Sequence, residues 1–322
     1  MVQVAAKEFR RDEPFRKERE NLHKIQDIRH PHLIQHLVTY EKAPQYYVIF
    51  PWAHGGSLTD FWERKDRTDR TRKLALWSLQ QMLGIAGALE ALHDVNCRHG
   101  DLKPANILHF INDKSETLVV ADVGVSKIHG KSTGLRRGGT KTRATTPAYE
   151  APEAFLDEEN PRARRYDIWS LGCIFLEYII WFLEDLTAVE RFTSTRETPE
   201  YEFYVVSQGE AEVHPTVNHA IDSIKKDIRC KGGTALEALV NLIADHMLQV
   251  EVDKRDTADI IVEKLSTIVL EAEQNQSRLF NEVDSASAPA NFHFIRRQAS
   301  MAYKSDCSTI HEEPSFMEKL KR

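Results

Sequence analysis

The sequence is poor in cysteine and has no pair of cysteines at metal-binding spacing. Its 322 residues contain four cysteines, and no two of them form a C-x-x-C pair. A zinc cluster of that type and a disulfide framework are therefore excluded, and a reducing compartment is favoured. The first residues also lack the long apolar segment of a secretory signal. We therefore expect an intracellular, cytoplasmic protein.

Neither sign of charge dominates the chain. Lysine and arginine number 43 against 49 aspartate and glutamate, which gives a net charge of −6. Such a balance produces no bulk attraction to nucleic acid, so we expect no nucleic-acid partner. Residues 168–183 are apolar enough to suggest a membrane span, but Glu177 lies near their middle. An acid there costs roughly 2.5–3.5 kcal/mol on insertion scales, so we predict a buried helix and no membrane span.

No internal repeat is present, so the order of elements has to define the fold. In the first fifty residues, strands are predicted at 2–7, 33–40 and 46–50, and a helix at 12–28. Later segments are mostly helical, with helices predicted at 74–94, 165–183, 217–228, 235–248 and 257–273, and short strands at 107–110 and 117–121. After residue 273 the periodicity stops and polar residues prevail. The sequence therefore predicts an α+β fold followed by a mostly disordered tail.

The strongest chemical signal lies in two loops next to predicted strands. The segment H-G-D-L-K-P-A-N occupies residues 99–106, and D-V-G occupies residues 122–124. Two acids, an amide and a lysine on neighbouring loops suit phosphoryl transfer, in which the protein positions groups and neutralises charge.

Each of these side chains has a part in that chemistry. Asp101 can accept a proton from a substrate hydroxyl or orient it, and Lys103 can neutralise the moving phosphoryl group. Asn106 and Asp122 can supply the hard oxygen ligands that Mg²⁺ prefers. Each residue is common alone, but this spacing is not.

With other motifs, these loops resemble those of the eukaryotic protein kinase family. V-A-A-K at residues 4–7 is similar to V-A-I-K, A-P-E stands at 151–153, and D-I-W-S-L-G at 167–172 is similar to D-x-W-S-x-G. Arg255 falls where that family has a late arginine that pairs with the glutamate of A-P-E. The match runs from about residue 2 to residue 270.

The resemblance implies a two-lobed, protein-kinase-like fold. Residues 1–53 are expected to form a truncated, β-rich small lobe that ends at a hinge. Residues 54–273 are expected to form a mainly helical large lobe with the catalytic loop and the activation segment. Residues 274–322 are expected to form the disordered tail.

The resemblance also implies a site for ATP and Mg²⁺. Lys7 is expected to contact the α and β phosphates and to pair with Glu18, with Glu20 as the alternative partner. The backbone of Pro51 and Ala53 in the hinge is expected to contact adenine. Asn106 and Asp122 are expected to hold the Mg²⁺ ion.

The resemblance extends to the serine/threonine branch of the family. Lys103 stands two residues after Asp101, as in that branch, and Thr146 matches the threonine that contacts both. We therefore predict transfer of the ATP γ-phosphoryl group to serine or threonine of a protein substrate. H-G-D followed by Asn106 also resembles small-molecule kinases, but A-P-E, residues 167–172 and Arg255 favour the protein-kinase pattern.

The chain departs from the family pattern in three places. No G-x-G occurs in it and six residues precede Lys7, so the Gly-rich loop that wraps the β and γ phosphates is missing. Two explanations stay open: a truncated form of an active kinase, which we favour, or a catalytically impaired pseudokinase that acts as a binding or scaffold module. Gly100 replaces the arginine of H-R-D, and Val123 replaces the phenylalanine of D-F-G.

The predicted activation segment is basic. Residues 127–143 carry six lysines and arginines and no acid. A phosphate on Thr140, Thr142 or Thr145 would be paired by these neighbours. A solvated loop with incidental charge is the alternative.

Overall fold

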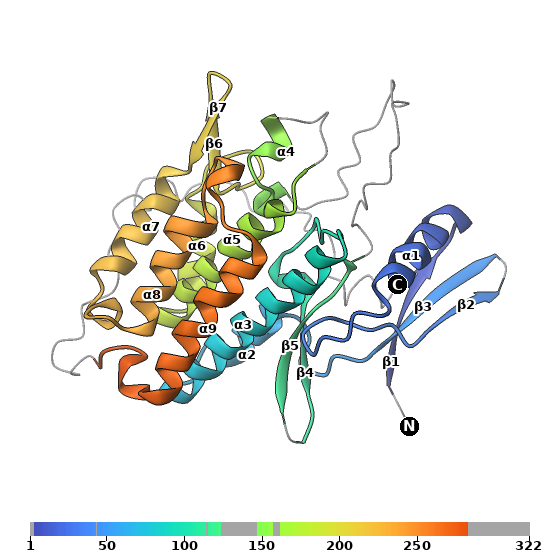
Figure 1. The fold of residues 1–322 in the computed structure, drawn as a ribbon, viewed down its shortest axis with the longest axis horizontal. Helices are drawn as coiled ribbons and strands as arrows, with labels where there is room; N and C mark the ends of the chain where they lie inside the picture. Colours follow the sequence, from blue (N-terminus) through green and yellow to red (C-terminus); the bar gives the residue numbers. More distant parts are fainter. Residues whose placement is uncertain (1–2, 43, 114, 124–146, 157–161, 283–322) are drawn as a thin grey trace, which may run out of the picture.

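The computed structural model describes residues 3–42, 44–113, 115–123, 147–156 and 162–282. Within them, a small lobe rich in strands is joined to a larger, mainly helical lobe (Figure 1). The predicted α+β, two-lobed architecture is confirmed. The predicted phosphorylation sites Thr140, Thr142 and Thr145 lie outside the described residues, as do Thr146 and residues 283–322.

The small lobe is built on an antiparallel sheet with the strand order β1-β3-β2. Its elements are β1 (Val4–Phe9), α1 (Asp12–Ile25), β2 (Val38–Lys42) and β3 (Gln45–Pro51). Helix α1 packs on the sheet through Phe15, which is buried and stacks on Tyr46 of β3 with 5.1 Å between the ring centroids. The predicted strand, helix and hairpin are confirmed in type and order.

Strand β2 begins at Val38, later than the predicted range of 33–40. The two residues that begin that range pair with the large lobe instead. The Ile34 N–H donates to the Val120 carbonyl at 2.9 Å, and Leu33 forms an isolated parallel bridge with Val120. A β-prone run pairs with whichever edge the fold brings to it, so composition does not fix its partner. This connection ties the small lobe to the large one.

The large lobe holds the longest helices (Figure 1). Its helices and strands are α2 (Leu58–Lys65), α3 (Arg72–Asp94), β4 (Ile107–Ile111), β5 (Glu116–Val120), α4 (Glu153–Leu156), α5 (Arg165–Leu183), α6 (Leu186–Ser194), β6 (Tyr204–Ser207), β7 (Glu210–Val213), α7 (Pro215–Lys226), α8 (Ala235–Leu242) and α9 (Ala258–Gln274). β4 pairs with β5 and β6 with β7, each as an antiparallel hairpin. Helix α3 packs along α9, so segments far apart in the chain share one core.

Helix α5 forms the centre of this lobe. Every residue after Arg165 in the helix is buried. Among the described residues it is the one helix long and apolar enough to cross a membrane, and the whole of that apolar window is buried in the fold. The predicted buried helix is confirmed.

Two glycines of α3 make room for two histidines of the small lobe. A Cβ at Gly84 would clash with the ring of His32, and one at Gly87 would lie 3.1 Å from His30 Nε2. His32 also bonds through Nδ1 to the Leu118 carbonyl of β5 at 2.7 Å. The two histidines therefore serve packing between the lobes.

Five elements were not predicted, namely α2, α4, α6, β6 and β7. Helix α2 has a local signal, because Ser57 and Asp60 form a capping box. Helix α6 begins after Asp185, whose side chain accepts a hydrogen bond from the Ala188 N–H at 2.7 Å. These elements are too short for a periodic pattern to establish them.

The predicted start of the tail is too early. Residues Gln276–Arg278 form a 3-10 turn, and Leu279 is fully buried. The ring of Phe280 lies edge-on to Phe182 of α5, with 5.9 Å between centroids. Two adjacent apolar residues in a polar segment give no periodicity, yet they are enough to anchor the chain here.

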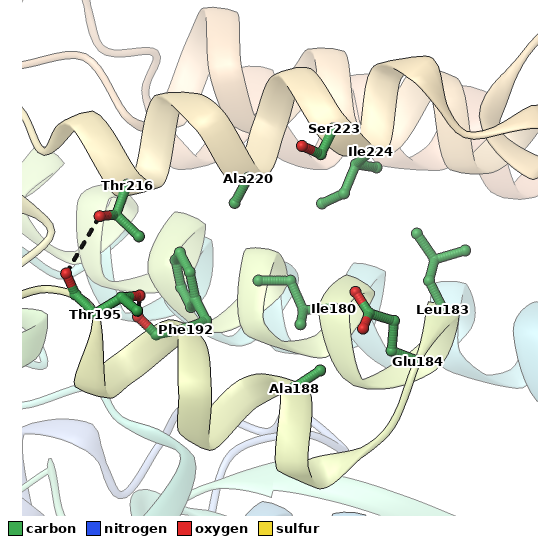
Figure 2. Close-up of a pocket in the computed structure, with 10 residues that line it drawn as sticks. All are labelled: Ile180, Leu183, Glu184, Ala188, Phe192, Thr195, Thr216, Ala220, Ser223 and Ile224. Atoms are coloured by element: carbon green, nitrogen blue, oxygen red, sulfur yellow. Dashed lines mark hydrogen bonds between the residues drawn. The ribbon is translucent and has the colours of Figure 1, made fainter. Parts of the chain in front are cut away.

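Helices α5, α6 and α7 enclose a hollow that is lined mostly by apolar side chains (Figure 2). At one end the Thr216 hydroxyl donates to the Thr195 carbonyl at 3.3 Å. At the other end is Glu184, whose pKa is raised to about 7 because burial disfavours its charge, despite Arg191 at 3.6 Å. None of the predicted catalytic or ATP-binding residues lines this hollow.

The carboxyl of Glu184 should make stability depend on pH. Its pKa in the folded state lies above the unfolded value, so the folded protein binds more protons and the free energy of unfolding falls as pH rises from about 4.5 to about 7. Glu184→Gln should remove up to about 3 kcal/mol of that fall. Urea unfolding at several pH values measures this, with Glu190→Gln on the exposed face of α6 as the control. Parallel pH profiles of the wild type and Glu184→Gln would contradict the prediction.

Candidate active site

The predicted catalytic loop follows helix α3 and runs into strand β4. A 3-10 turn, Pro104–Asn106, connects the loop to the strand. The side chains of Asp101, Lys103 and Asn106 are all buried. The loop is therefore held inside the large lobe and does not extend over its surface.

Asp167 of α5 holds the catalytic loop from below. Its two carboxylate oxygens accept hydrogen bonds from the His99 N–H at 2.8 Å and the Gly100 N–H at 2.9 Å. His93 Nε2 of α3 lies 2.9 Å from the same carboxylate. Burial alone would raise the pKa of Asp167, but the His93 hydrogen bond and nearby positive charges lower it below its usual value. The ionised carboxylate thus satisfies two backbone amides that water does not reach.

Three predicted catalytic side chains meet above this anchor. Lys103 Nζ lies 3.5 Å from Asp101 Oδ2. Asn106 Nδ2 donates to the Asp101 carbonyl at 2.8 Å and to its Oδ2 at 3.2 Å. The other amide atom, Asn106 Oδ1, is buried and has no hydrogen-bond partner among the described residues. An acid, a cation and a spare amide oxygen therefore lie together.

Lys7 connects the small lobe to the second predicted loop. Its Nζ lies 2.8 Å from Glu18 Oε1 of α1 and 2.7 Å from Asp122 Oδ1, just after β5. Burial would lower the pKa of Lys7, but Asp122 and Glu18 raise it above its usual value. The first of these distances shows that Glu18, and not Glu20, is the partner of Lys7. The backbone of Asp122 has a φ of +61°, a left-handed conformation that is uncommon outside glycine.

The predicted hinge continues from β3. Pro51 is the last residue of that strand and pairs with Val4 of β1. The Ala53 carbonyl accepts a hydrogen bond from the Gly56 N–H at 3.1 Å. The Ala53 carbonyl therefore already has a partner within the fold.

One arginine at the site was missed from the sequence. Arg98 is buried, its guanidinium lies over the Tyr166 ring at 5.1 Å, and its Nη1 donates to the Arg162 carbonyl at 3.0 Å. Gly100 has a φ of +80°, and a Cβ there would lie 3.4 Å from Arg98 Nε. Arg98 thus packs directly beside the loop at Gly100.

The late ion pair implied by the resemblance is present. Arg255 donates to the two carboxylate oxygens of Glu153 at 2.9 and 3.1 Å, and its guanidinium lies over the ring of Trp169 in α5. Arg255 is fully buried. The A-P-E segment is thus fixed to the helical core.

These contacts agree with a comparison of the chain with known families. The family model of the protein kinase domain matches residues 2–265, most of the chain. The chain belongs to the protein kinase domain family.

Curated protein kinases also match this kinase domain. It is 31% identical over 150 residues to calcium/calmodulin-dependent protein kinase type 1 of Macrobrachium nipponense, an alignment that covers 47% of this chain and 40% of the relative. It is 32% identical over 150 residues to calcium/calmodulin-dependent protein kinase cmkA of Emericella nidulans, covering 47% of this chain and 34% of the relative. The matched part is thus less than half of these curated relatives.

Replacement of Asp167, which holds the backbone of the predicted catalytic loop, should destabilise the kinase domain. Asp167→Asn removes a buried charge and one of the two acceptors, so we expect a loss of about 3 kcal/mol or more in the free energy of unfolding. Asp253→Asn is the control, because Asp253 pairs with Arg165 of the same helix from a fully exposed position and should leave stability unchanged. Chemical unfolding of both variants tests this, and equal stabilities would contradict it.

Proposed function

We propose that this chain transfers the γ-phosphoryl group of ATP to a serine or threonine hydroxyl of a protein substrate. One observation carries the proposal. The salt-bridged Lys7, Glu18 and Asp122 adjoin the fold's two-lobe junction, while Asp101, Lys103 and Asn106 converge on the neighbouring loop. A binding module would have no need of all six groups in paired, buried positions.

Asp101 and Lys103 are proposed as the catalytic residues. Asp101 orients the acceptor hydroxyl and accepts its proton, for which its carboxylate is kept in place by Asn106. Lys103 carries a fixed positive charge next to that carboxylate and offsets the negative charge on the transferred phosphoryl group. Phosphoryl transfer needs this positioning and neutralisation more than covalent chemistry.

Asn106 and Asp122 are proposed to hold Mg²⁺. The buried, unpartnered Asn106 Oδ1 fits this role, since a bare amide oxygen is a suitable ligand and would otherwise cost free energy. No group of three or more His, Cys, Asp or Glu in the described part of the chain could hold a metal by itself. Two protein ligands suffice, because Mg²⁺ in such sites takes its other ligands from phosphate and water. When bound, the ion neutralises phosphate charge.

Lys7 is proposed to bind the ATP phosphates, and the hinge to bind adenine. Glu18 holds the ammonium of Lys7 within the fold at 2.8 Å. The Ala53 N–H and the Pro51 carbonyl are the proposed hinge contacts, since proline has no N–H to donate. These contacts do not depend on a Gly-rich loop, which favours phosphoryl transfer over the scaffold alternative.

The proposal also includes the chemical class of the acceptor residue and the cellular location of the protein. The serine/threonine class is supported by Lys103 at its position two residues after Asp101, and a protein acceptor is supported by the curated relatives, which are named as protein kinases. An intracellular location is supported by Cys173 and Cys230, which are buried and form no disulfide in the described part of the chain.

The test is phosphoryl transfer from radiolabelled ATP to a mixture of serine- and threonine-containing protein acceptors. Asp101→Asn should lower the transfer rate by about 10²- to 10⁴-fold, the usual contribution of a positioned base. Asp113→Asn, the same change at an exposed carboxylate on the β4–β5 turn, is the control and should retain full activity.

A thermal-shift titration with Mg·ATP separates binding from turnover. Wild type and Asp101→Asn should both show a nucleotide-dependent increase in Tm, because Asp101 is not a proposed nucleotide ligand. Wild type without transfer to any acceptor, or transfer that survives in Asp101→Asn, would overturn the proposed reaction. A nucleotide shift without transfer in the wild type would favour the scaffold alternative.

A further inference from the structure

A buried polar network lies beneath residues 147–151, away from the ATP site. Its centre is Glu177 of α5, which is 2% exposed. Glu177 Oε2 accepts a hydrogen bond from the Tyr149 hydroxyl at 2.8 Å. The Ser170 hydroxyl, also on α5, donates to the Tyr149 carbonyl at 2.8 Å. Helix α5 therefore holds Tyr149 both by its side chain and by its backbone.

Arg196, in the turn after α6, brings the positive charge to this network. Its Nη2 lies 3.6 Å from Glu177 Oε1. The guanidinium lies over the rings of Phe192 and Phe203, at 4.4 and 4.0 Å from their centroids. Its Nε donates to the Tyr201 carbonyl at 3.0 Å. Two rings and a carbonyl thus hold the charge in one position, at 1% exposure.

The state of Glu177 depends on this arginine. Burial raises the pKa of Glu177, while the positive charge of Arg196 and the Tyr149 hydrogen bond act in the opposite direction. Without the guanidinium, the carboxylate would be a buried, uncompensated charge, and it would take up a proton or move. Either change would alter the carboxylate oxygen to which the Tyr149 hydroxyl donates its hydrogen bond.

Helix α5 carries both this network and the carboxylate that holds the predicted catalytic loop. Asp167 holds the loop backbone, Ser170 lies one turn later, and Glu177 lies about 15 Å from Asp167 along the axis at 1.5 Å per residue. Because α5 is buried throughout, it does not shift independently of either site. Residues 147–151 also follow directly on Thr146, which lies outside the described residues and which the resemblance predicts to contact Asp101 and Lys103.

We propose that Arg196 is a positioning residue for the acceptor substrate. In this proposal Arg196 neutralises Glu177, which keeps Tyr149 and the backbone of residues 147–151 at a fixed position, and the acceptor segment binds against that backbone. This inference rests on the proposed protein kinase activity. It assigns a role in acceptor binding to the turn between α6 and β6, whose sequence carries no catalytic motif.

The test compares variants at the two ends of the network. Tyr149→Phe removes only the hydroxyl, and Arg196→Met removes the charge and the guanidinium hydrogen bonds while keeping an unbranched side chain among the rings. Each should raise the KM for the acceptor about five- to tenfold, the effect of one lost hydrogen bond, with the KM for ATP and the acceptor-independent hydrolysis of ATP within about twofold of wild type. Arg196→Lys, which retains the charge, should recover part of the loss.

Tyr178→Phe is the matched control. Tyr178 is the next residue of α5 after Glu177, is buried, and shares a hydrogen bond of 2.6 Å with Ser78, outside the network. It undergoes the same chemical change as Tyr149→Phe and should leave the acceptor KM unchanged. An equal rise in KM for both variants would show a general effect of loosening the core and would overturn the proposal.

A double variant and hydrogen exchange complete the test. Because Arg196 and Tyr149 act through one carboxylate, Arg196→Met/Tyr149→Phe should raise the acceptor KM no more than the larger single change. Independent, multiplicative effects would overturn the shared route. Amide exchange of residues 147–151 should accelerate in both single variants whether or not the wild type transfers phosphate. Faster exchange without activity would therefore count against the proposed function alone, and unchanged exchange would count against the role of Arg196.

Discussion

The ionised carboxylate of Asp167, buried at the start of α5, is the interaction on which the site depends. A helix that is apolar on all sides has to lie in a core, so its few polar groups are the available means of holding loops in place. The Asp167 carboxylate accepts hydrogen bonds from two backbone N–H groups of the predicted catalytic loop. Trp169 of the same helix supports Arg255 and, through it, Glu153. The rigid core and the chemistry are thus connected through one element.

Much of the fold could be predicted from the pattern of apolar residues in the sequence. Long helices were identified by their apolar period, and the membrane alternative for α5 was correctly rejected on the position of Glu177, which pairs with Arg196. Several short elements were not identified, because α6 and the β6–β7 hairpin depend on capping and on packing such as that of Phe192 against Phe203. The pairing of Ile34 with Val120 likewise depends on where the lobes meet.

The site was predictable where the chemistry follows local sequence. The spacing of Asp101, Lys103 and Asn106 predicted one loop of the site, and the V-A-A-K motif predicted that Lys7 belongs to the same site. Glu18 was preferred to Glu20 on the resemblance to the kinase family, and the structure pairs Glu18 with Lys7. The contact of Lys7 with Asp122 was not predicted. Arg98 and Arg196 could not be found in this way. Their roles come from aromatic rings and carbonyls that tertiary packing brings to them.

The ammonium of Lys7 is shared between Glu18 and Asp122, two acids from different lobes. Lys7 is therefore a shared counter-ion that joins the two lobes through these carboxylates. If the proposed magnesium–nucleotide complex binds here, Asp122 would exchange the ammonium of Lys7 for the metal ion, and Lys7 would exchange a carboxylate for a phosphate. The number of charge pairs would be the same before and after that exchange.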